Sequence, residues 1–184
     1  MKKYCGSCEA SHEVVVSNDV REYKIKETNV SARITILKCA YCGNEIYDKA
    51  NEIENDIILF DEYKKKNNLL TSREIIEIRQ KYGLSQATFS KILGFGLKTI
   101  TRYENGSIQD STHDSFLRLL REENNFILLW TIKKHTLTES EISKIQSKFF
   151  KQDVPSIDYE FKEPCYNKPY VTITTNGGYG YDGH

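Results

Sequence analysis

Four cysteines near the start of the chain have the spacing of a metal site. They form two CxxC pairs, Cys5 with Cys8 and Cys39 with Cys42, and thirty residues lie between the pairs. Two residues between thiols allow a tight turn to present both sulfurs to one ion, and in a reducing compartment such pairs indicate zinc more often than disulfides. Four thiolates leave no coordination position for water, so the pattern predicts a structural Zn²⁺. A redox dithiol is the alternative, but a single CxxC would suffice for it.

The second stretch whose residues could do chemistry is Leu84–Gly106, LSQATFSKILGFGLKTITRYENG. Its apolar spacing predicts two short helices, the first of which begins after Ser85 as N-cap. Gly94 and Gly96 flank Phe95 and predict a sharp turn with Phe95 in the core. Four residues of the first helix are expected to pack inward: Ala87, Phe89, Ser90 and Leu93.

The second helix of this stretch is expected to begin near Leu97 and to have one buried and one exposed face. Ile100 and Tyr103 form the inward face, and Gly106 ends the helix. The outward side chains are Lys98, Thr99, Thr101 and Arg102. Lys and Arg donate to guanine O6 and N7, and Thr can bond a base edge or touch a thymine methyl group. The stretch therefore predicts a helix-turn-helix that reads DNA in the major groove; the alternative is a helical hairpin with its charged face in water.

The charge of the chain is balanced overall and positive only around the predicted helix-turn-helix. The 184 residues contain 26 Lys and Arg and 26 Asp and Glu, whereas residues 71–121 carry eight basic and five acidic side chains. This distribution indicates a local phosphate-facing surface. No apolar run reaches the ~18 residues of a membrane span, and the first residues lack the apolar core of a signal peptide. We therefore expect a cytoplasmic protein without a membrane partner.

The segments around the cysteines are expected to be strands. Four of them have strand composition: residues 12–17, 23–28, 34–37 and 45–47. Asn29 and Ser31 predict a hairpin turn, and Gly6 and Gly43 are expected to give the two cysteine turns their backbone freedom. Residues 1–48 are thus predicted to form a small zinc-ribbon-like β domain, which is too small to be held together by apolar burial alone.

The rest of the chain is predicted to be mainly helical, which makes the fold class α+β. The expected segments are a linker helix at 49–70, an all-α helix-turn-helix DNA-binding domain at 71–124, a C-terminal helical extension at 125–153 and an extended, flexible tail at 154–184. The lysine run at 64–66 is expected to be a solvated part of the linker, and a phosphate-tracking arm is the alternative.

Local signals add detail to the helical part. Thr71 and Glu74 have the spacing of a capping box, and a second box is expected at 138–141. Arg79 could contact a DNA phosphate or pair with Glu104; the pair is expected, because Glu104 would otherwise lie unpaired close to DNA phosphates.

The part after Gly106 carries weaker signals. A helix there is expected to be capped by Ser111 or Thr112, and its inward residues are Phe116, Leu117, Leu119 and Leu120. The apolar run 126–130 is either core or a dimer interface. In the tail, Tyr170–Thr175 is strand-prone, and Cys165 is expected to be a spectator thiol. The tail is either disordered or a segment that folds on a partner such as a toxin or a chaperone.

These motifs together resemble a known family. Residues 71–121 resemble Xre/Cro helix-turn-helix domains, with Arg79 in the first helix, the LSQ entry at 84–86 and the RYENG exit at 102–106. Combined with the upstream cysteine pairs and the Gly-Phe-Gly at 94–96, the chain resembles the MqsA antitoxin family with its YgiT-type zinc finger.

The resemblance implies a specific function. In that family the zinc is structural, the N-terminal zinc domain binds a toxin, often a ribonuclease, and the C-terminal domain dimerises and binds palindromic operator DNA to repress its own operon. The implied zinc ligands are Cys5, Cys8, Cys39 and Cys42. The implied base readers are Lys98 and Arg102, while Ser85 and Gln86 would lie at the DNA backbone.

Two other function classes remain for comparison. A stand-alone zinc-finger and helix-turn-helix repressor of a phage or mobile element would have no toxin partner, and a toxic neighbouring reading frame would argue against it. An enzyme is not expected, because the histidines at 12, 113, 135 and 184 are scattered and a four-thiolate site leaves no position for water.

Overall fold

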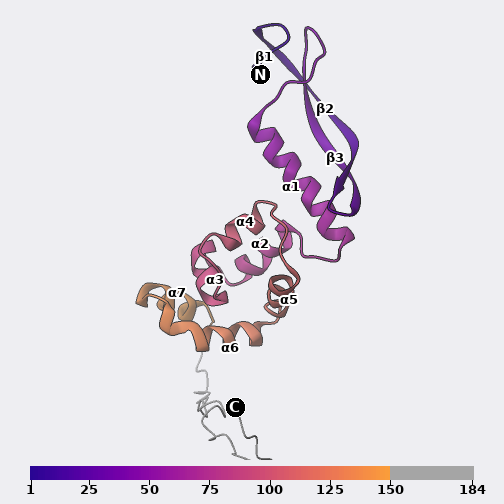
Figure 1. The fold of residues 1–184 in the computed structure, drawn as a ribbon. Coiled ribbons are helices and arrows are strands. Elements are labelled where there is room, and N and C mark those ends of the chain that lie inside the picture. The colour runs from indigo at the N-terminus through magenta and orange to yellow at the C-terminus, as the bar shows by residue number, and fades with distance from the viewer. Residues whose placement is uncertain (150–184) are drawn as a thin grey trace, which may run out of the picture. The chain divides into compact units, whose positions relative to one another are not determined.

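The computed structural model describes residues 1–149 and confirms an α+β fold (Figure 1). A three-stranded antiparallel sheet comes first in the chain and helices follow it. The predictions for the tail at 154–184, for the end of the extension at 125–153, for the strand at Tyr170–Thr175 and for Cys165 lie outside the described residues.

The sheet has the strand order β1-β2-β3. β1 (Lys2–Cys5) pairs with the first residues of β2 (Ala10–Ile25), and β3 (Thr28–Cys39) pairs with the rest of β2. The short strand expected at 45–47 is reduced to an isolated bridge between Lys38 and Glu45. Alternate side chains of β3 are buried on one face: Val30, Ala32, Ile34 and Ile36.

The chain turns between β2 and β3 at Lys26 and Glu27, and Lys26 adopts a left-handed φ of 51°. The predicted hairpin turn at Asn29 and Ser31 is therefore wrong, since both residues lie inside β3. Their turn preference is outweighed by the alternating apolar residues from Val30 onward, which reach the core only if the strand has already begun.

Helix α1 (Lys49–Lys66) packs along β3 and begins at the N-cap Asp48. The side chain of Asn55 donates to the carbonyl oxygen of Thr35 (2.8 Å) and accepts from its backbone N–H (2.9 Å). Leu59 packs against the buried residues of β3. This helix therefore adds a layer to the sheet and shares its apolar core.

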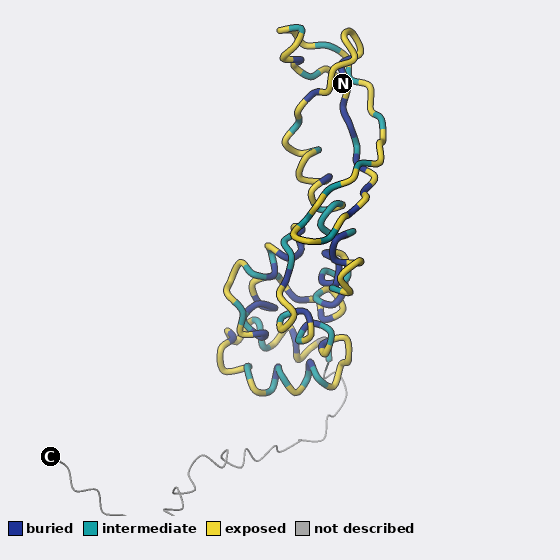
Figure 2. The backbone as a smooth tube through the Cα atoms, turned by 45° about the vertical axis from the view of Figure 1, so that its right-hand side comes forward, coloured by how far each residue is buried: buried dark blue, intermediate teal, exposed yellow. Residues whose placement is uncertain are grey.

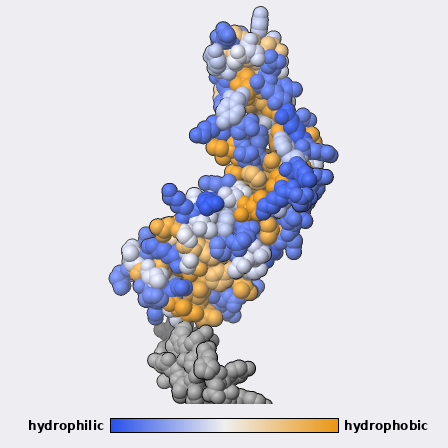
Figure 3. Space-filling view, in the orientation of Figure 1, coloured by the Kyte–Doolittle hydropathy of each residue, from blue (hydrophilic) through white to orange (hydrophobic). Residues whose placement is uncertain are grey.

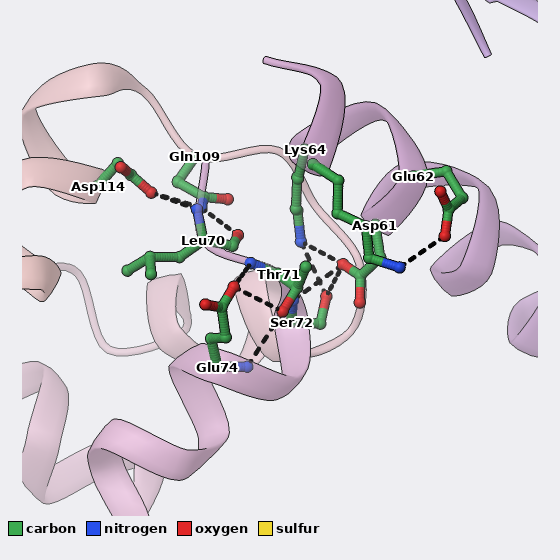
Figure 4. A network of polar contacts seen from close by, with 10 residues as sticks. Asp61, Glu62, Lys64, Leu70, Thr71, Ser72, Glu74, Gln109 and Asp114 are labelled. Carbon is green, nitrogen blue, oxygen red and sulfur yellow. Dashed lines mark hydrogen bonds and ion pairs between the residues drawn. The ribbon is translucent and has the colours of Figure 1, made fainter. Parts of the chain in front are cut away.

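The end of α1 is tied to the start of the next helix by a buried lysine (Figure 4). The Lys64 side chain is 0% exposed, and its ammonium donates to Asp61 (3.1 Å) and to the Ser72 hydroxyl (2.8 Å). Asp61 also accepts the backbone N–H of Ser72 at 2.9 Å. The prediction of a solvated lysine run is wrong for Lys64, because the following helix folds back over it.

The helical part begins with the predicted capping box, in which Thr71 and Glu74 bond each other's backbone N–H groups. Its helices are α2 (Ser72–Lys81), α3 (Gln86–Leu93), α4 (Thr99–Glu104), α5 (Ser111–Leu119), α6 (Glu123–Lys133), the 3-10 turn η1 (Lys134–Thr136) and α7 (Glu139–Phe149). Buried positions concentrate where α2 to α6 meet (Figure 2). This core contains Leu70, Ile75, Ile78, Phe89, Ile92, Ile100, Leu117, Leu120 and Phe126.

Three details differ from expectation. Ala87 is exposed, because the inward face of α3 includes Thr88 and Ile92 instead. Helix α5 is capped by Asp110, which accepts the backbone N–H of His113 at 2.9 Å. A carboxylate at this position also interacts favourably with the helix dipole. Leu119 is 56% exposed.

The apolar run 126–130 belongs to the core only in part. Phe126 and Trp130 are buried, whereas Leu128 is 43% exposed and Ile132, further along α6, is 39% exposed. Apolar side chains accordingly reach the surface along α6 (Figure 3). Phe126 stacks on Tyr82 with ring centroids 3.8 Å apart. Phe149 of α7 lies against the same two rings.

Candidate metal centre and nucleic-acid interface

The fold brings the four predicted cysteines together. The sulfurs of Cys5, Cys8, Cys39 and Cys42 all lie within 4.8 Å of one another, and those of Cys5 and Cys42 are 3.6 Å apart. A tetrahedral zinc with Zn–S bonds of about 2.3 Å requires sulfur separations of about 3.8 Å. The cluster therefore fits one tetrahedral ion, with one pair of ligands at the β1–β2 turn and the other after β3.

Each cysteine pair closes a tight turn, but the two turns use different residues. Gly43 has φ of 77°, and its N–H donates to the carbonyl oxygen of Cys39 at 2.9 Å. In the first turn the left-handed residue is Glu9 (φ 53°), which occupies the position that Gly43 has in the second. The expectation that Gly6 supplies this freedom is wrong, since a positive φ is needed just after the second cysteine of each pair.

The surroundings differ from one sulfur to the next. Cys5 and Cys39 are buried with Leu37 and Ile46, whereas Cys42 is exposed. Burial raises the pKa of the Cys5 thiol, but the backbone N–H groups of Cys8 and Ser7 and the Cys42 side chain lower it, to about 7. A thiol of this pKa is about half thiolate at neutral pH, and the thiolate is the form that binds metals. The Cys42 side chain, burial and the other two cysteines instead raise the pKa of Cys8 to about 12.

Helix α4 presents the predicted outward face. Ile100 is 0% and Tyr103 8% exposed, as predicted for its inward face. Among the outward residues Lys98 and Arg102 are exposed, whereas Thr99 and Thr101 are half-buried. The helix begins at Thr99, two residues later than expected, with Lys98 in the N-cap position.

A buried ion pair holds α4 against α2. Arg79 donates to both carboxylate oxygens of Glu104, at 2.6 and 2.8 Å, and to the carbonyl oxygen of Leu84 at 2.8 Å. The predicted Arg79–Glu104 pair is therefore confirmed, and its bidentate geometry fixes the orientation of both helices.

Helix α3 is joined to the same carboxylate. Gln86 donates to Glu104 at 2.7 Å and accepts from the Thr101 hydroxyl at 2.8 Å. Ser85 is the N-cap of α3, as predicted, and accepts the backbone N–H of Thr88. Gln86 thus has a structural task that its sequence position alone did not reveal.

Tyr103, on the buried face of α4, belongs to a cluster of three rings. The Tyr103 hydroxyl lies 2.7 Å from Nδ1 of His113, whose ring stacks on Phe95 with centroids 3.9 Å apart. Gly94 makes the turn before Phe95 possible, with φ of 71°. His113 lies ten positions after Tyr103, so no sequence period could have indicated their contact.

A comparison with known protein families assigns the chain to one of them. The family model of MqsA, the antitoxin component of bacterial toxin–antitoxin systems, matches residues 1–127. The chain belongs to the MqsA antitoxin family. The match includes the four cysteines, the sheet, helices α1 to α5 and the first residues of α6, whereas α7 lies beyond it.

Membership in the MqsA family makes this chain an antitoxin-type, metal-binding and DNA-binding regulator. No curated protein matches the chain at the level of sequence. Within residues 1–149, none of the helices has the length and apolar character needed to cross a bilayer.

Proposed function

We propose that this chain is the antitoxin of a type II toxin–antitoxin system, which neutralises a cognate toxin and represses its own operon by binding operator DNA. The observation that carries the proposal is α4, a short helix with exposed Lys98 and Arg102, held in place by the Arg79–Glu104 ion pair. A rigid helix with two exposed basic side chains four positions apart is suited to the major groove.

In this proposal the residues have separate tasks. Lys98 and Arg102 read base edges, and Thr99 and Thr101 lie beside them. Ser85 and Gln86 at the start of α3 approach the DNA backbone, where the first orphan N–H groups of a helix can bind phosphate.

The four-cysteine cluster would hold a structural zinc ion. Its donor set consists of thiolates alone, and the ion would join the β1–β2 turn to the turn that follows β3. When bound, the metal would stabilise the sheet and take no part in catalysis. We assign toxin binding to this N-terminal part, on the basis of the family.

Operator binding is proposed to involve a homodimer on a palindromic site. The surface groove between α5 and α6 is lined by Asn125 and by apolar residues that include the exposed Leu119, Leu128 and Ile132. A second copy of the chain would cover this face and would place two α4 helices roughly 34–36 Å apart, one turn of DNA. We also propose that the tail at 154–184 binds a partner, such as the toxin or a chaperone.

Co-expression with the product of the neighbouring reading frame would test the proposal. We expect that product to arrest growth alone, to be neutralised by this chain and to co-purify with it. DNA from upstream of the same operon should bind the purified chain more tightly than a scrambled duplex of equal length. Operator binding without any toxic neighbour would instead support a stand-alone repressor.

A further inference from the structure

The last described helix docks on α3 through a single carboxylate. Glu141 accepts hydrogen bonds from the Thr88 hydroxyl (2.9 Å) and from Lys91, whose ammonium lies 3.1 and 3.2 Å from its two oxygens. The same carboxylate accepts the backbone N–H of Thr138 at 2.9 Å, in the capping box that begins α7. Two apolar residues of α7 also pack inward: Ile145 is 2% exposed, and Phe149 lies against Tyr82. The docking therefore combines an apolar anchor with one charged contact.

That charged contact lies next to the part of α3 that we assign to the DNA backbone. The Thr88 hydroxyl that donates to Glu141 is also 2.8 Å from the Ser85 hydroxyl, at the N-terminus of α3. The Glu141 carboxylate is thus two hydrogen bonds away from Ser85. Two hydrogen bonds of 2.9 and 2.8 Å span less than the ~8–10 Å over which salt screens charges. The Glu141 carboxylate would therefore repel a phosphate bound at Ser85.

The partners of Glu141 are also the groups that bind phosphates in other proteins. Lys91 offers an ammonium and Thr88 a hydroxyl, one helical turn apart on the same face of α3. Here a carboxylate occupies both of them. The side chains are only partly exposed, at 32% for Lys91 and 19% for Glu141, so solvent screens the pair incompletely.

We propose that α7 is a built-in brake on DNA binding, in which Glu141 occupies Lys91 and Thr88 in place of a DNA phosphate. This inference rests on the proposed DNA-binding function. The family match ends at residue 127, so the brake belongs to an extension that this chain carries beyond the matched region. Release of Glu141 frees Lys91 as an additional phosphate contact.

The test compares Glu141→Gln with Glu139→Gln in the full chain. Both substitutions remove one negative charge from the first turn of α7, but Glu139 is exposed. Binding of the fluorescent upstream DNA is measured by anisotropy over a range of KCl concentrations. We expect Glu141→Gln to bind about three- to tenfold more tightly than Glu139→Gln, with a steeper salt dependence by about one phosphate contact.

A third variant assigns the effect to Lys91. Adding Lys91→Gln to Glu141→Gln should cancel the gain in affinity. In the absence of DNA, acetic anhydride should modify Lys91 faster in Glu141→Gln than in Glu139→Gln, as followed by mass spectrometry.

Equal affinities of the two glutamate variants would overturn the brake while leaving DNA binding intact. Weaker binding by Glu141→Gln would also overturn it, since Glu141 would then support α3 rather than oppose the DNA. Absence of specific binding by the wild-type chain would overturn the proposed DNA-binding function, and the brake with it.

Discussion

At the scale of single residues, the side chains that hold α4 in place are different from those that it turns outward. Glu104 is buried and accepts from Arg79 and Gln86, and Thr101 joins the same group through Gln86. Lys98 and Arg102 lie on the exposed side of the helix. Substitutions in the two groups should therefore have different consequences, on stability in one case and on base recognition in the other.

Arg102→Ala should weaken binding to the upstream DNA by about 1–3 kcal/mol and relax specificity at one base pair, because one bidentate guanine contact would be lost. Anisotropy titrations with single-base variants of the operator would measure both effects. Arg73→Ala is the matched control, since Arg73 is exposed on α2 and pairs only with Glu77 on its own helix among the ion pairs described for residues 1–149. An unchanged affinity for Arg102→Ala would show that α4 does not read the bases.

At the scale of elements, short polar contacts decide how neighbouring helices join. Lys64 links the end of α1 to the start of α2, and Glu141 links α7 to α3. Burial lowers the pKa of the Lys64 ammonium, although Asp61 opposes this change. A charge in such a place stabilises the joint only while its partner is present.

Lys64→Met should reduce the free energy of unfolding by about 2–4 kcal/mol, since Asp61 would keep its charge without a cation. Urea unfolding followed by circular dichroism would measure the loss. The control is Lys65→Met, because Lys65 is 59% exposed in its pair with Glu62 and should cost less than about 0.5 kcal/mol. Equal losses in the two variants would contradict the structural role of Lys64.

The docking of α7 should become less stable at acid pH. The backbone N–H of Thr138, against an opposing effect of burial and together with Thr88 and Lys91, lowers the pKa of Glu141 to about 2 from an ordinary 4.5. Because the folded pKa is the lower one, the ionised carboxylate stabilises the fold above about pH 4.5, and this contribution is lost as the pH falls toward 2.

The free energy of unfolding, measured by urea at several pH values, should therefore fall more steeply below pH 4.5 in the wild-type chain than in Glu141→Gln. Parallel pH profiles for the two proteins would mean that this carboxylate does not hold α7 in place.

At the scale of the molecule, the sheet has two small apolar clusters, one at the cysteines and one that Leu59 of α1 covers. Most other buried apolar residues lie in the helical part. The sequence predicted the features that depend on neighbours along the chain, such as the caps at Thr71 and Ser85 and the clustering of the CxxC pairs. It misplaced the hairpin turn, and it left Lys64 in solvent, because both depend on packing between distant segments. The second task of Gln86 was missed for the same reason.

Metal removal should unfold the sheet and leave the helical part folded. A bound zinc ion stabilises small zinc modules by about 10–16 kcal/mol, so a chelator or Cys39→Ser should unfold the sheet while α2 to α6 stay folded. Calorimetry should show two transitions for the metal-loaded chain and one after chelation. Cys165→Ser should leave both transitions in place. A single transition that chelation shifts as a whole would contradict independent cores.

The arrangement around Glu104 has a consequence for how operator preference can diversify. Four inward or half-buried residues of α4 anchor the helix: Ile100, Thr101, Tyr103 and Glu104. Positions 98 and 102 can therefore be exchanged without disturbing the scaffold. Duplicated copies of such a gene could acquire distinct target sites through two codon changes and so avoid cross-regulation, and the same two positions offer a compact library for engineering orthogonal repressors.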